Sequence, residues 1–138
     1  MKIVINNCYG GFGLSEKAIF RLAELKGITL YPEDGKYGLK TYYTVPVNER
    51  TPELADWHSA SMEDRQAANE AYTREHFYAR DLPRDDAQLV HVVEELGAKE
   101  ASGDYAELKI VEIPDNVEWE IAEYDGSEWV SEKHRVWS

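Results

Sequence analysis

The first hydrophobic positions of the chain form one short block followed by a helical pattern. Ile3, Val4 and Ile5 are consecutive, which predicts a strand over residues 2–7 that is buried on both faces. Between residues 16 and 26, apolar side chains recur on one face of a helix. Gly27 is expected to end this helix in a left-handed conformation. A second strand is then expected over residues 28–31.

The middle of the chain is patterned more weakly. The Tyr-rich residues 39–47 predict a strand, and Pro46 indicates an edge position for it. Residues 62–76 lack glycine and proline and carry few apolar side chains, which predicts a surface helix or a lid. We therefore expect a single domain over residues 1–138, with residues 32–84 as an elaboration or lid region.

The last third of the chain predicts a helix followed by strands. Asp85 and Gln88 form a capping-box pattern, so Asp85 is expected as the N-cap of a helix that ends at Gly97. Residues 98–104 are expected to form a polar loop, and residues 106–113 a strand. Apolar and polar side chains alternate over residues 117–122, which is typical of a half-exposed strand.

Asp125-Gly126 is a strong signal for a type I′ turn, so the chain is expected to return as a hairpin strand. The predicted fold class is α+β. In it, an N-terminal unit of strand, Gly-rich turn and helix packs with an antiparallel sheet that includes the C-terminal hairpin.

Composition and charge narrow the function classes. The 138 residues are 43% hydrophobic and contain one cysteine, so no internal disulfide is possible. No apolar run reaches the roughly 18 residues of a membrane span, and we expect a cytoplasmic protein with no membrane partner. The net charge of −12 disfavours nucleic-acid binding, which depends on neutralising phosphates. An ordinary acidic surface is favoured over mimicry of DNA.

The stretch "CYGGFGLS" is the main candidate for a ligand site. A Gly-rich turn between a buried strand and the helix cap Ser15 exposes backbone amides that can hold an anion. It lacks the Lys-Ser/Thr of a P-loop, and Glu16 stands where the third glycine of a dinucleotide fingerprint belongs. A packing turn is the alternative, and both remain open. The candidate ligand-binding residues here are Asn6, Tyr9, Gly10, Gly11, Phe12, Gly13 and Ser15.

Other chemical groups are sparser. Arg135 could clamp a phosphate and His134 could donate to it, or both could be solvated at a strand end. Cys8 is interpreted as a small buried filler. The four glutamates Glu118, Glu120, Glu123 and Glu128 are interpreted as an exposed acidic face. No pair of histidines and no His/Cys pair has metal-ligand spacing, so neither a metal nor a cofactor is expected.

The blocks "MKIVINNCYGGFGLSEKAI", "RDDAQLVHVVEELG" and "LKIVEIPDNVEWEIAEYDGSEWVSEKHRVW" resemble a family of small, largely uncharacterised bacteriophage proteins. The resemblance implies a role in an infected host cell. We expect a homo-oligomer that sequesters a small nucleotide-derived ligand, such as an immune signalling nucleotide, without catalysis. Two alternatives are a phosphodiesterase-type enzyme with His134 as the acid, and an acidic protein-binding inhibitor or DNA mimic.

Overall fold

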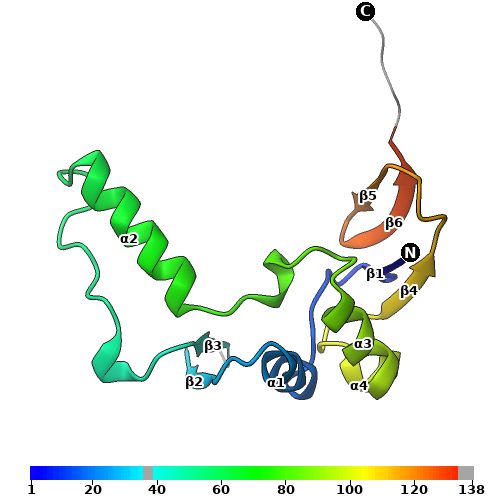
Figure 1. Cartoon of the computed structure of the whole chain (residues 1–138), viewed down its shortest axis with the longest axis horizontal. Helices are drawn as coiled ribbons and strands as arrows, with labels where there is room; N and C mark the ends of the chain where they lie inside the picture. Colours follow the sequence, from blue (N-terminus) through cyan, green and yellow to red (C-terminus); the bar gives the residue numbers. More distant parts are fainter. Residues whose placement is uncertain (36–38, 134–138) are drawn as a thin grey trace, which may run out of the picture. The chain divides into compact units, whose positions relative to one another are not determined.

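The computed structural model describes residues 1–35 and 39–133 and has the α+β class that the sequence predicts (Figure 1). The chain divides into two compact units. Residues 1–26 and 79–138 form one, called here the discontinuous unit. Residues 27–78 form the other, called the inserted unit. None of the helices in the described ranges is long and apolar enough to cross a bilayer.

The core of the discontinuous unit lies between two antiparallel strands and three helices. Strand β1 (Lys2–Asn6) pairs with β4 (Leu108–Glu112), with Val4 opposite Ile110. Helix α3 (Ala87–Leu96) packs against β1 and against α1 (Glu16–Leu25). The fully buried apolar side chains described in this unit are Ile3, Val4, Ala18, Leu22, Leu89, Val92 and Ala101. The prediction that the first strand is buried on both faces is confirmed.

The C-terminal hairpin also forms as predicted. Strands β5 (Trp119–Tyr124) and β6 (Ser127–Glu132) pair antiparallel, with Tyr124 opposite Ser127. Asp125 and Gly126 have φ of 51° and 90°, the left-handed pair that a type I′ turn requires. The hairpin is a two-stranded sheet of its own whose strand β6 packs beside β1.

The ends of α1 and α3 lie where the sequence predicts them, except for the N-cap of α3. Ser15 caps α1, since its Oγ accepts from the backbone amide of Ala18 at 3.1 Å, and Gly27 follows with φ of 71°. The predicted N-cap Asp85 is wrong: Asp86 caps α3, and its Oδ1 accepts from the amides of Gln88 and Leu89. A carboxylate at the cap accepts from amides two or three residues on, and in this chain Asp86 holds that place.

The expected polar loop over residues 98–104 is also corrected. A short helix, α4 (Ala98–Ala101), begins directly after Gly97, whose φ of 82° allows the change of direction. Ala101 is fully buried, and its carbonyl accepts from the backbone amide of Ser15 at 2.8 Å. The turn of helix forms because it packs against α1, which local sequence does not reveal.

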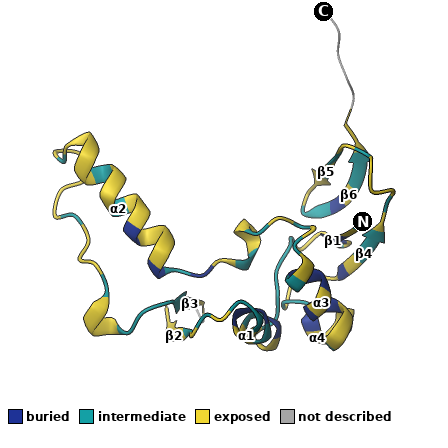
Figure 2. Cartoon of the chain, in the orientation of Figure 1, coloured by how far each residue is buried: buried dark blue, intermediate teal, exposed yellow. Residues whose placement is uncertain are grey.

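The inserted unit consists of a hairpin, a 3-10 helix and one exposed α-helix. Strands β2 (Tyr31–Asp34) and β3 (Lys40–Tyr43) pair antiparallel, so the second strand begins at the end of the expected 28–31 segment. The 3-10 helix η2 (Val47–Glu49) starts after Pro46. Helix α2 (Met62–Glu75) forms as predicted and buries only Ala71 and Glu75, so its surface is mostly exposed in Figure 2.

Candidate functional site

The Gly-rich turn between β1 and α1 is packed against backbone on two sides. A Cβ at Gly10 would lie 1.7 Å from the carbonyl oxygen of Tyr105, a distance that no side chain tolerates. A Cβ at Gly126 in the hairpin turn would lie 2.7 Å from both the amide nitrogen of Gly11 and the carbonyl oxygen of Tyr9. The glycines therefore allow three backbone segments to approach closely, which is the role of a packing turn.

Other parts of the turn differ in exposure. Gly11 has φ of 90° and Gly13 has no atom close to a Cβ position. Tyr9 is 71% exposed, whereas Phe12 is half-buried. His134 and Arg135, which were expected to complete a phosphate site here, lie outside the described residues.

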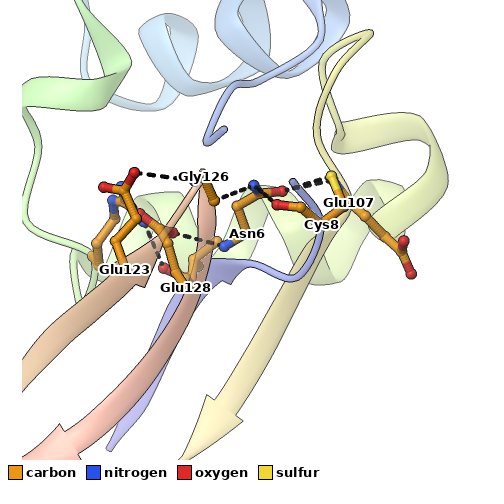
Figure 3. Close-up of polar contacts among 8 residues, drawn as sticks. Asn6, Cys8, Glu107, Glu123, Gly126 and Glu128 are labelled. Carbon is orange, nitrogen blue, oxygen red and sulfur yellow. Dashed lines mark hydrogen bonds and ion pairs between the residues drawn. The ribbon is translucent and has the colours of Figure 1, made fainter. Parts of the chain in front are cut away.

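The side chain of Asn6 joins this turn to the hairpin and to β4 (Figure 3). It is fully buried. Its Nδ2 donates to the carbonyl oxygens of Cys8 and Gly126, both at 2.8 Å, and its Oδ1 accepts from the backbone amide of Glu107 at 2.8 Å. The half-buried Cys8 thiol also donates to Oδ1 at 3.3 Å. The hydrogen-bonding capacity of this amide is used inside the protein.

A buried ion pair covers the second edge of β1. The carboxylate of Glu128 is only 7% exposed and accepts from Arg84 in a bidentate geometry, with N–O distances of 2.7 and 2.9 Å. The same carboxylate accepts from the backbone amide of Asn6 at 2.8 Å, and the Arg84 carbonyl accepts from the amide of Val4 at 2.9 Å. The two residues thus satisfy an edge of β1 that none of the described strands pairs with.

This pair corrects the interpretation of Glu128 as part of an exposed acidic face. Glu128 lies on the same side of the hairpin as Val130, because side chains two residues apart share a face. A carboxylate on that side is a signal of a buried partner, and the sequence analysis missed it. Arg84 was missed as well. Its guanidinium lies 3.6 Å above the ring of Phe12, so one face of that ring is covered by the protein itself.

The inserted unit holds a cavity of about 600 Å³ with aromatic walls. His76 follows the end of α2, and its ring stacks on Tyr72 with centroids 3.9 Å apart. It also contacts the ring of Tyr43 at 4.6 Å and lies nearly parallel to Tyr78 at 5.8 Å. The hydroxyl groups of Tyr72 and Tyr78 are 2.6 Å apart and share a hydrogen bond. Trp57 and Arg50 complete this wall.

Two charged groups of the cavity, Arg50 and Glu75, are held by neighbouring groups of the same unit. The Arg50 guanidinium lies 3.4 Å above the Tyr43 ring and pairs with the Glu33 carboxylate of β2. Its Nε is buried with no hydrogen-bond partner among the described residues. Glu75 is 6% exposed and accepts from the backbone amide of Thr51 at 2.5 Å. That amide, together with the Thr51 hydroxyl, lowers the pKa of the Glu75 carboxyl.

The His76 ring has a defined hydrogen-bond arrangement. Its Nδ1 is 2.7 Å from the backbone carbonyl of Tyr72, and because a carbonyl only accepts, Nδ1 carries the hydrogen. This bond fixes the ring plane against Tyr72. The cavity wall is therefore a preformed stack.

This cavity was not predicted from the sequence. One signal was present: Tyr72 and His76 are four residues apart, which places them on one face of a helix. The contribution of Tyr43 and Arg50 could not be inferred, since their approach depends on how the β2–β3 hairpin meets α2.

A second hollow of about 670 Å³ lies along the exposed side of α2 and is lined by Trp57, Met62 and Arg65. It offers one aromatic ring where the first cavity offers several. No group of three or more His, Cys, Asp or Glu within residues 1–35 and 39–133 could hold a metal ion.

Comparison of the chain with protein-family models, with curated proteins and with solved structures gives no match. The site's own geometry therefore supplies the structural argument about function.

Proposed function

We propose that this protein binds a small nucleotide-derived ligand in the aromatic cavity of the inserted unit and holds it without chemical change. The observation that carries the proposal is the stack of Tyr43, His76 and Tyr72 beside the guanidinium of Arg50. Aromatic rings bind nucleobases by stacking, whatever the base. A volume of about 600 Å³ also falls in the range of small-molecule sites.

One feature supports binding over turnover. The Glu75 carboxylate accepts hydrogen bonds from Thr51. General acid–base catalysis needs a group within hydrogen-bond reach of the reacting atom. In this cavity Glu75 is held by Thr51 and serves to fix the wall.

The cavity is favoured over the Gly-rich turn as the place of binding. Backbone of Tyr105 and of the hairpin turn packs against the turn, and the Asn6 amide is used internally. The resemblance to bacteriophage proteins supports a role in an infected host cell. There, binding of a host signalling nucleotide would keep it from its receptor.

Isothermal titration calorimetry tests the proposal with adenosine, guanosine, their 3′,5′-cyclic monophosphates and ADP-ribose as titrants. We expect saturable binding of at least one, and recovery of the intact compound by chromatography after denaturation. Absence of binding to all of them would overturn the proposal, and recovery of a cleaved product would favour the phosphodiesterase-type alternative.

Three variants locate the site. Tyr72→Ala removes a stacked ring and should weaken binding by about tenfold or more, since base stacking contributes about 1–3 kcal/mol. Tyr124→Ala removes a ring that is 71% exposed in the discontinuous unit and should leave binding unchanged. Tyr9→Ala should also leave it unchanged; a loss there with Tyr72→Ala unaffected would return the site to the Gly-rich turn.

A further inference from the structure

The charges around the aromatic cavity limit the ligands it accepts. Two carboxylates, Glu53 and Glu75, line the cavity, and Arg50 is the one arginine or lysine in the described lining. That arginine is already paired with a third carboxylate, Glu33. The inserted unit as a whole has nine acidic and five basic side chains. A ligand with several negative charges therefore meets repulsion, and the one arginine in the described lining is already paired.

The position of Glu33 indicates which ligands are disfavoured. Its carboxylate is paired with the guanidinium that lies 3.4 Å from the centroid of the Tyr43 ring, so a phosphate near Arg50 would be repelled by Glu33 and would compete with it for the same cation. A phosphate that replaced the Glu33 carboxylate at Arg50 would gain little free energy, because one ion pair is lost as the other forms. The rings of Tyr43, His76 and Tyr72 attract a nucleobase whether or not the ligand is charged.

From this geometry, and resting on the function proposed above, we infer that the cavity takes nucleosides or nucleotides with one negative charge and discriminates against polyphosphates. Glu33 is the specificity-determining residue, because it is paired with the one guanidinium in the described lining of the cavity.

The test compares adenosine, 3′,5′-cyclic AMP, AMP and ATP, and the matching guanosine series, by calorimetry. In the wild-type protein the nucleoside and the cyclic monophosphate should bind about tenfold or more tightly than the triphosphate. Glu33→Gln keeps the shape of the side chain and releases Arg50. It should raise the affinity for AMP and ATP about fivefold or more relative to that for the nucleoside.

Asp34→Asn is the matched control. Asp34 is the next residue of β2 and is exposed, and its substitution removes the same charge without releasing Arg50. If Asp34→Asn raises ATP affinity as much as Glu33→Gln, a role specific to Glu33 is overturned.

Salt dependence gives a test that needs no variant. Repulsion between the cavity and a polyphosphate is screened by salt, so ATP affinity should rise between about 50 and 500 mM NaCl while that of the nucleoside stays constant. A fall in ATP affinity, or tighter binding of ATP than of the nucleoside, would overturn this inference and leave the proposed function standing. Absence of binding by every compound would overturn both.

Discussion

Arg84 and Glu128 form a bidentate ion pair across 44 residues of sequence, with N–O distances of 2.7 and 2.9 Å. The two residues supply hydrogen-bond partners to backbone groups of Val4 and Asn6, as a neighbouring strand would. The stability of β1 should therefore depend on both side chains.

The substitution Arg84→Met should lower the free energy of unfolding by about 3–5 kcal/mol, because it leaves a buried carboxylate without a cation. Urea unfolding followed by circular dichroism measures the loss. Arg21→Met is the control: Arg21 pairs with Glu95 at the surface, and its loss should cost about 1 kcal/mol or less. Equal effects of the two substitutions would contradict the structural role of the Arg84 pair.

The substitution Asn6→Leu keeps a similar volume and removes every side-chain hydrogen bond described for this residue. Backbone groups of Cys8, Gly126 and Glu107 would lose their partner in hydrogen bonds that are partly buried, and an unsatisfied buried group costs about 1–3 kcal/mol. We expect a loss of at least about 3 kcal/mol in chemical denaturation. Asn7→Leu, at the exposed neighbouring position, should change stability by less than about 0.5 kcal/mol.

Substitutions of Gly10 and Gly13 should show which glycine of the turn is closely packed and which has free space beside it. Gly10→Ala places a methyl group against the Tyr105 carbonyl and should destabilise the protein by about 2 kcal/mol or more. Gly13→Ala meets no atom and should be tolerated within about 0.5 kcal/mol. Thermal unfolding of both variants measures the contrast, and similar melting temperatures would contradict the close approach at Gly10.

The cap of α3 predicts a pH dependence. Partial burial would raise the pKa of the Asp86 carboxyl, but the Lys26 ammonium at 2.9 Å and the amides of Leu89 and Gln88 lower it below its ordinary value of 3.8. A carboxyl with a lowered folded-state pKa stabilises the protein above its unfolded-state pKa, and that stability is lost as the pH falls through the folded-state value.

Wild type should accordingly be more stable than Asp86→Asn at pH 6, and the difference should shrink below about pH 4. Denaturant unfolding between pH 2 and 6 measures it. Asp85→Asn changes the exposed neighbour and should stay close to wild type throughout. A larger effect of Asp85→Asn would restore the cap that the capping-box pattern predicted.

Features set by a few consecutive residues were predictable. The cap at Ser15, the left-handed Gly27 and the Asp125-Gly126 turn each follow from the conformational preferences of single residues. The choice between Asp85 and Asp86 was not predictable at this level, since both carboxylates stand within one residue of the helix start.

Features set by distant partners were missed. Glutamate usually lies at the protein surface, and the burial of Glu128 depends on its ion pair with Arg84. The aromatic cavity combines residues of β3, of the segment after η2 and of α2, so its rings are separated in sequence by up to 35 residues. The hydrophobic pattern of a sequence predicts which face of one helix or strand is buried. This cavity lies where several such elements meet, and their approach is not part of that pattern.

The contacts of β1 also constrain the order in which the chain can fold during synthesis. The inserted unit is one continuous segment, whereas Asn6 obtains partners at Glu107, Gly126 and Glu128. A ribosome delivers those partners more than 100 residues after Asn6, so β1 completes these hydrogen bonds long after it has been translated. A nascent chain that stops before Glu128 has left the ribosome would carry the edge of β1 exposed.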